Sequence, residues 1–374
     1  MKRLLPLIAL IFAVLVCFGC RAQKYEIAMI TDVGTIDDKS FNQGTWEGVK
    51  KFGQERNISH KYYKPQSKST EDYIKTIDLA IKGGAKVVVT PGYLFEPAIY
   101  VVQDKYPDVK FILIDGAPNN FTYDESGNLI GGEERIEDNV YSLFYAEEQS
   151  GFLAGYAVVK DGFRNLGFMG GMAVPAVVRF GHGFVQGAEY AARELGLDND
   201  AISIKYHYIG KFEPTPETQT MAASWYAGGV DVIFVAAGGA GSSVMKAAEA
   251  TENKYVIGVD VDQSAESDTV ITSAVKMLAT SVYQCLDVIY NENSEYKNIY
   301  KAGQKMTLDA SIDGVGLPSD FSRFPNKRFT KQDYDAIFAK LKNREVTVSK
   351  NLKPDNVTFE EFFNLDKVQV TVIS

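Results

Sequence analysis

The chain has 374 residues, of which 45% are hydrophobic and 23% are charged, and its formal net charge is −9. A chain of this length can bury a sizeable core and is expected to form two domains. Because the charge is acidic and no basic surplus could displace counterions, the composition argues against nucleic acid or anionic lipid as the main partner.

The N-terminal segment predicts secretion. A short basic start precedes an apolar run over residues 4–16, which is too short to span a bilayer. Cys20 then follows the small residue Gly19, as in a lipoprotein signal. We expect a signal peptide over residues 1–19, and on Cys20 a diacylglyceryl group with an amide-linked chain such as palmitate. The alternative is an ordinary signal peptide, or an uncleaved anchor, with a coincidental cysteine.

Apolar strands alternate with amphipathic helices along the mature chain. The expected strands are 26–30, 86–89, 110–114, 165–169, 232–235 and 255–259. This alternation is typical of parallel sheets covered by helices on both faces. Ligands bind such sheets beyond the carboxyl ends of the strands, so Asp115, Gly238, Gly239 and Asp260 are candidates.

The pattern occurs in two rounds, over about residues 25–135 and 160–262. Two such sheets whose strand ends converge would form a cleft. The tail from about residue 326 is expected to contain a helix over 331–341 flanked by short strands.

The loop after the first strand is the most specific feature. Ser40 is expected to cap the following helix, with Gln43 completing a capping box. Asp37 and Asp38 have a simpler interpretation, as acidic residues that complement the helix dipole.

Phe41 and Asn42 fall on the first turn of the same helix and are expected to face the cleft. For Phe41, the alternative is a hydrophobic contact beneath the helix.

The remaining residues show no catalytic or metal-binding pattern. The histidines, His60, His182 and His207, are isolated from one another and lack metal-ligand spacing, and His182 is expected at the surface. Cys285 lies on an apolar helix face and is expected in the core. No nucleophile elbow, Walker loop or dinucleotide fingerprint is present in the sequence, so we expect neither enzyme activity nor a metal or other cofactor.

The run Asp38-Lys39-Ser40-Phe41-Asn42-Gln43-Gly44 resembles the basic membrane protein family of lipoproteins, whose members include purine nucleoside receptors that feed ABC importers. Further matches in the same order extend the resemblance over residues 25 to about 320. They are Gly170-Gly171-Met172 with Pro175, Phe180, Gly183-Phe184 and Gly187-Ala188, then Gly238 to Gly241, Ile257 to Gln263, and Thr272 to Lys276.

The resemblance implies an α/β type I periplasmic-binding-protein fold. Two doubly wound parallel-sheet lobes would hold a ligand cleft between them, with three crossings of the chain. The expected division is an N-terminal lobe over 25–145 and 268–300, a C-terminal lobe over 146–267 and 301–325, and a C-terminal helix and strands over 326–374 that pack on the lobes.

The resemblance also implies how a base would be held. Phe41 would stack on one face and Phe212 on the other, while Asn42 and Asp115 would bond its edge. Stacking of a base on an aromatic ring contributes roughly 1–3 kcal/mol. Two rings from opposite lobes can both stack only when the cleft is closed, so binding would favour closure. Glu213 follows Phe212 where the family usually has aspartate, so a shift of one residue stays open.

The sugar contacts follow from the same resemblance. Asp260 would accept from both ribose hydroxyls and Lys276 would donate to the sugar. Gly238 and Gly239 would let the backbone approach the ligand, and Asp32 would order the first loop and touch sugar or base. The alternatives are a solvated strand-end acid for Asp260, and for Lys276 an ion pair with Asp32 or Asp260.

The expected protein is thus a monomeric, lipid-anchored receptor of an ABC importer at the cell membrane, in a periplasm or on the cell surface. It would capture adenosine, guanosine or inosine and deliver it to permease subunits. Alternatives are a sugar or signal-molecule receptor of the same fold, and a surface adhesin. A calcium-dependent nucleoside hydrolase is disfavoured, because Ile30 stands where that motif needs an aspartate.

Overall fold

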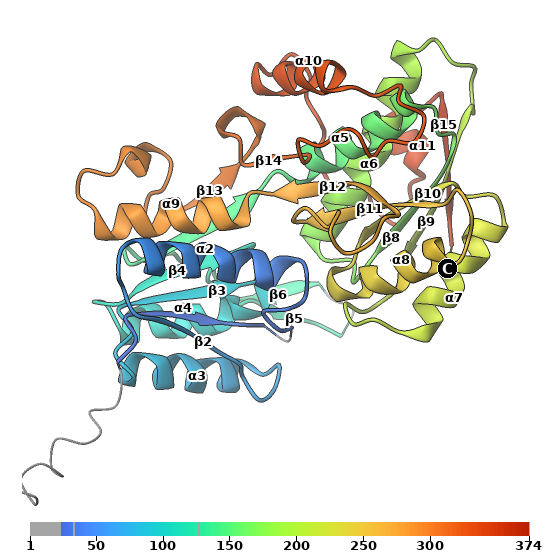
Figure 1. The fold of residues 1–374 in the computed structure, drawn as a ribbon. Coiled ribbons are helices and arrows are strands. Elements are labelled where there is room, and N and C mark those ends of the chain that lie inside the picture. Colours follow the sequence, from blue (N-terminus) through green and yellow to red (C-terminus); the bar gives the residue numbers. More distant parts are fainter. Residues whose placement is uncertain (1–23, 33, 126–127, 374) are drawn as a thin grey trace, which may run out of the picture.

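A computed structural model describes residues 24–32, 34–125 and 128–373 (Figure 1). The expected signal peptide and Cys20 lie outside these residues. The described chain forms two parallel sheets that lie side by side, each covered by helices on both faces. Among the described residues, no helix is long and apolar enough to cross a membrane.

The first lobe is built on a six-stranded sheet of order β13-β7-β4-β3-β1-β2, paired in parallel throughout. Alternate residues of β1 point to opposite faces, so Ile27 and Met29 join one core and Ala28 and Ile30 another. The strands are β1 (Ile27–Ile30), β2 (His60–Tyr63), β3 (Val87–Pro91), β4 (Lys110–Ile114), β7 (Val140–Tyr145) and β13 (Gln304–Leu308). The helices are α2 (Phe41–Glu55), α3 (Thr70–Lys82), α4 (Glu96–Lys105) and α9 (Leu278–Tyr290), with a small hairpin of β5 (Thr122–Tyr123) and β6 (Leu129–Gly131).

The second lobe is built on a seven-stranded sheet of order β14-β12-β11-β10-β8-β9-β15, in which β14 runs antiparallel to β12. The strands are β8 (Asn165–Gly170), β9 (Ile202–Tyr208), β10 (Val232–Ala236), β11 (Tyr255–Asp260), β12 (Val270–Lys276), β14 (Val315–Gly316) and β15 (Val368–Val372). The helices are α5 (Glu147–Asp161), α6 (Pro175–Glu194), α7 (Pro216–Ala227), α8 (Gly241–Glu249), α10 (Lys331–Lys342) and α11 (Phe359–Phe363). Short 3₁₀ turns occur in both lobes. Those of the first lobe are Tyr93–Phe95 and Glu295–Asn298, and those of the second are Gly238–Ala240 and Ala310–Ile312.

The chain crosses between the lobes three times, after Tyr145, after Lys276 and after Leu308. Two of the expected boundaries are therefore wrong. The strand Val270–Lys276 belongs to the second sheet, because it pairs in parallel with β11, and β13 belongs to the first sheet, because it pairs with β7. Each crossing follows the carboxyl end of a strand. The hydrophobic pattern of a strand does not show which of the two sheets that strand joins, so the boundaries could not be predicted from it.

The C-terminal tail completes the second lobe. Its expected helix is confirmed as α10, and β15 adds a parallel edge strand beside β9. The Glu189 carboxylate accepts from the backbone of three successive residues of this tail, 366–368. His182 is 3% exposed and lies beneath Phe359 and Phe363, so its expected surface position is wrong. The expected burial of Cys285 is confirmed.

Helices α5 and α6 of the second lobe pack backbone against backbone. A Cβ atom at Gly151 would lie 2.1 Å from the Phe180 carbonyl oxygen, and one at Gly187 would lie 1.9 Å from that of Phe152. Only glycine permits this approach, so the relative position of the two helices is tightly defined.

Candidate functional site

The start of α2 is organised by Asp38. Its carboxylate accepts from the backbone nitrogens of Ser40, Asn42 and Gln43 at 2.9–3.0 Å. The expected capping box is wrong, because the Ser40 hydroxyl instead donates to Asp260 Oδ2, 2.5 Å away in the other lobe. The Gln43 amide donates to Glu47 at 3.1 Å. Asp38, which the sequence offered only as a dipole partner, is the residue that satisfies the exposed helix nitrogens.

Asn42 is 3% exposed, and its side chain is engaged within the loop. Its Nδ2 donates to Asp32 Oδ1 at 3.0 Å and to Asp38 Oδ2 at 2.9 Å. Asp32 Oδ1 also accepts from the Gly34 backbone at 2.7 Å, so Asp32 orders the first loop. Because both amide protons of Asn42 are used here, a donor role toward a ligand would require this network to change.

Phe41 lies beside Asp32 at the carboxyl end of the first sheet. A Cβ atom at Gly92 would lie 3.8 Å from Phe41 Cε1 and 3.9 Å from Asp32 Oδ2, which places both side chains next to the end of β3. Phe41 is half-buried, and its ring centroid is 5.1 Å from the Lys276 ammonium. Tyr145 and Phe180 lie at 5.5 and 5.3 Å from the same ammonium, so rings from both lobes surround it.

Lys276, at the end of β12, is the centre of a buried charge cluster. Its Nζ lies 2.5 Å from Asp115, 3.0 Å from Glu147 and 3.9 Å from Asp260. Burial alone would lower the pKa of Lys276, but these three carboxylates raise it above its ordinary value. Lys276 is therefore charged, and it is ion-paired to both lobes.

Asp115 and Asp260 end β4 and β11 in the same unusual backbone conformation. Their φ angles are 54° and 66°, in the left-handed region where aspartate is tolerated better than most residues. Burial raises the pKa of Asp115 to about 6 despite Lys276, and burial likewise raises the pKa of Asp260. Asp260 is 7% exposed, so the alternative of a solvated strand-end acid is wrong. Oδ1 of Asp115 is buried without a hydrogen-bond partner among the described residues.

Phe212 lies on the loop after β9, against the glycine-rich strand ends of the second lobe. A Cβ atom at Gly171 would lie 2.3 Å from Phe212 Cε1, so the ring rests directly on this glycine. The Phe212 carbonyl accepts from Ala240 at 2.8 Å, and a Cβ atom at Gly238 would lie 3.8 Å from Phe212 Cβ. The structure thus brings Phe212, Gly238 and Gly239 together at one edge of the second sheet.

Direct contacts join the lobes around these residues. Gln263 is 2% exposed, and its amide donates to the Lys39 carbonyl at 2.7 Å. Lys39 pairs with Glu266 at 3.7 Å, and Lys68 with Glu213 at 3.6 Å. The lobes are therefore in contact, which brings their strand ends together.

Sequence reasoning missed Glu147, Ser40 and Gln263 as members of this region. Glu147 stands in the first turn of α5, where an acidic residue commonly complements the helix dipole, so its local sequence did not mark it. Ser40 was assigned to a local cap, and Gln263 was noted only within a matched run. Nothing local in the sequence shows that the partners of Ser40 and Gln263 lie in the other lobe.

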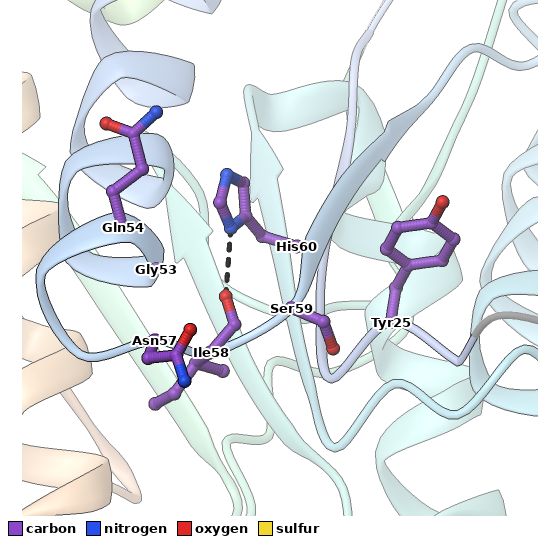
Figure 2. Close-up of a pocket in the computed structure, with 7 residues that line it drawn as sticks. All are labelled: Tyr25, Gly53, Gln54, Asn57, Ile58, Ser59 and His60. Carbon is purple, nitrogen blue, oxygen red and sulfur yellow. Dashed lines mark hydrogen bonds between the residues drawn. The ribbon is translucent and has the colours of Figure 1, made fainter.

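A separate cavity of about 380 Å³ lies at the amino end of the first sheet (Figure 2). His60 in its wall bonds the Ile58 carbonyl at 3.0 Å. The cavity lies at the start of β2 and contains none of the candidate site residues; its lining is Tyr25, Gly53, Gln54, Asn57, Ile58, Ser59 and His60. Across residues 24–32, 34–125 and 128–373, no group of three or more histidine, cysteine or acidic side chains could hold a metal ion.

Known proteins share both the fold and the sequence pattern. A solute-binding protein of an ABC transporter system from Aeropyrum pernix superposes with a TM-score of 0.64 at 22% identity, over 86% of this chain and 87% of that one. Another from Conexibacter woesei gives 0.66 at 19% identity, over 88% and 100%. These likenesses confirm the expected periplasmic-binding-protein fold.

Curated relatives are more similar in sequence. The ABC transporter nucleoside-binding protein BmpA of Lactococcus lactis is 28% identical over 353 residues, which cover 85% of this chain and 92% of the relative. Basic membrane protein B of Borreliella burgdorferi is 29% identical over 303 residues, covering 80% and 82%. The Lactococcus lactis relative is named as a binding protein and not as an enzyme, and substrate-binding proteins of ABC importers act outside the cytoplasm.

The model of the Bmp family, described as ABC transporter substrate-binding protein PnrA-like, matches residues 25–351. The chain therefore belongs to the Bmp family of ABC transporter substrate-binding proteins.

Proposed function

We propose that this protein captures purine nucleosides by closure of its two lobes and delivers them to an ABC permease. The observation that carries the proposal is the meeting of Phe41, Asp260 and Lys276, which come from different lobes and lie at one place. A ring with carboxylate and ammonium groups beside it suits a ligand that has flat apolar faces and a hydroxylated sugar. The nucleoside-binding name of the Lactococcus lactis relative supports the same ligand class.

In this proposal Phe41 and Phe212 stack on the base, and Asp32 or Asn42 bonds its edge. Asp115 helps to bond the base edge, Lys276 donates to the sugar, and Asp260 accepts from the sugar hydroxyls. Gly238 and Gly239 leave room for the ligand beside Phe212.

A thermal-shift screen of ligand-free protein from residue 21 onward tests the ligand class. Nucleosides, free bases and sugars are compared, and a ligand at about 100 times its Kd should stabilise the protein by about 2.7 kcal/mol. Adenosine, guanosine or inosine should raise the Tm, whereas ribose and free bases should not. No shift with any purine nucleoside would refute the proposal, and a shift with a sugar alone would favour a sugar receptor of the same fold.

Two substitutions separate the base contact from the sugar contact. Phe41→Ala and Asp260→Ala should each weaken binding at least about tenfold, or about 1.4 kcal/mol, as measured by calorimetry. Wild-type affinity in either variant would remove that residue from the site.

We further propose that the protein is monomeric and that Cys20 carries a lipid anchor. Labelling cells with radioactive palmitate should label the wild-type protein, and Cys20→Ala should abolish the label and release the protein from membranes. A Cys20→Ala protein that stays in the membrane fraction would indicate an uncleaved anchor instead.

A further inference from the structure

Glu147 is a wholly buried carboxylate at the first crossing between the lobes. Its exposed fraction is 0%, and it begins α5 directly after the chain leaves β7. Its Oε2 accepts from Arg179 Nε at 2.7 Å, and its Oε1 lies 3.0 Å from Lys276 Nζ. Burial alone would raise the pKa of Glu147, but Lys276 and Arg179 lower it below its ordinary value. Glu147 is therefore ionised and bridges two cations.

The position of Arg179 is set by the close packing of α5 and α6. The glycine contacts between the helices leave little freedom for α6 to slide along α5. Arg179 lies one turn into α6, and its side chain is 19% exposed. It therefore contacts Glu147 from a helix whose position relative to α5 is fixed. The carboxylate of Glu147 is held in place from one side by this arginine.

Lys276 has three ammonium protons to distribute among three carboxylates. Asp115 accepts a hydrogen bond from its Nζ and Glu147 Oε1 forms an ion pair with it at 3.0 Å, whereas Asp260 Oδ1 stands at 3.9 Å. The other oxygen of Asp260, Oδ2, accepts from Ser40. Because opposite charges attract strongly where water is excluded, the ammonium would move toward Asp260 if one of its two nearer partners were lost.

We propose that Glu147 is a positioning residue: anchored by Arg179, it holds the Lys276 ammonium away from Asp260 and so keeps Asp260 Oδ1 available to ligand hydroxyls. The inference rests on the proposed function in one respect only, which is that the ligand hydroxyls belong to the diol of a sugar. Glu147 itself acts through Lys276.

The neighbouring residue supplies a matched control. Glu147→Gln leaves one carbonyl oxygen to serve two cations, so its amide nitrogen must face either Arg179 or Lys276. Glu148→Gln makes the same change of side chain one residue further along α5, where the side chain lies 4.0 Å from Arg179 and makes no ion pair with Lys276 among the described residues. Glu147→Asp keeps the charge and should restore part of the wild-type behaviour.

Crystal structures of the two ligand-free variants test the geometry without any ligand. In Glu147→Gln, Lys276 Nζ is expected to approach Asp260 to about 3 Å, a hydrogen-bond distance. In Glu148→Gln it should stay where the wild-type places it. A Lys276 that does not move in Glu147→Gln overturns the proposal.

Calorimetry with guanosine and 2′-deoxyguanosine tests the consequence for binding. Glu147→Gln should weaken the binding of guanosine at least about tenfold and that of 2′-deoxyguanosine much less. The preference of the protein for ribose over deoxyribose therefore falls. Glu148→Gln should keep both affinities within about twofold of wild type. Equal losses for both ligands would show that Glu147 only supports the fold, which contradicts the proposal. If wild-type protein binds no nucleoside, the proposed function fails, and the crystal structures alone still decide the inference.

Discussion

The two lobes arrange the polar groups near their contact in different ways. In the first lobe, Asp32, Asp38 and Asn42 form a network within one loop, with partners at most ten residues apart. In the second lobe and at the crossings, Lys276 gathers carboxylates from three separate elements. The first arrangement depends on a local turn, and the second depends on how the two sheets are joined. Disturbing each region should therefore have different consequences for stability and binding.

The largest effect is expected from removing the shared cation. Lys276→Met leaves three buried carboxylates without their common partner, which should cost about 3–5 kcal/mol of unfolding free energy. Lys254→Met is the matched control, because Lys254 pairs with Asp231 at 3.0 Å near the surface and should cost about 1 kcal/mol or less. Denaturant unfolding measures both, and similar losses would show that the buried cluster is no more important than a surface ion pair.

The next effect is a pH dependence in the same region. Burial raises the pKa of Glu148 from 4.5 to about 7. The stabilisation associated with its protonated form is complete below the unfolded value and is lost as pH rises through about 7. Glu148→Gln, which does not titrate, should therefore gain stability relative to wild type by about 2–3 kcal/mol between pH 4.5 and pH 8. Thermal unfolding across this range measures the difference, and a constant difference would contradict the raised pKa.

A smaller effect, on ligand affinity, is expected from a substitution that displaces the Phe212 ring. Gly171→Ala would place a methyl group 2.3 Å from the Phe212 ring and force that ring to move. If Phe212 stacks on the ligand, affinity should fall about tenfold with little change in Tm. Gly241→Ala is the control, because the nearest atom to its added Cβ lies 3.6 Å away. Unchanged affinity in Gly171→Ala would remove Phe212 from the binding site.

The smallest effect concerns the loop of the first lobe. Asp38→Ala removes the acceptor for three backbone nitrogens at the start of α2 and should cost about 1–2 kcal/mol of unfolding free energy. Asp37→Ala removes a charge one residue earlier and should have an effect below about 0.5 kcal/mol. Urea denaturation of the two variants compares them, and equal costs would mean that the net charge of the loop matters and its hydrogen bonds do not.

Much of the fold could be predicted from local pattern. The expected strands that end at Ile114 and Val259 match β4 and β11 closely, and the acidic residues after them, Asp115 and Asp260, both lie near Lys276. Continuous apolar runs and strand-end acids are local features, so they can be read before the sheets are known. The expected placement of Val270–Lys276 in the N-terminal lobe was wrong, because the sheet that a strand joins depends on its partner strand and not on the strand itself.

The sequence by itself determined the main buried strands, the two-round α/β organisation and the strand-end positions of Asp115 and Asp260. Only the tertiary structure decided which polar and charged side chains pair with one another. Ser40 reaches Asp260 across 220 positions of sequence, and Lys276 reaches Asp115 across 161. These pairs depend on three crossings that bring the carboxyl ends of two sheets together. The hydrophobic pattern of a strand or helix reports only that element's own structure. It therefore does not show which distant residue a polar side chain will bond in the other lobe.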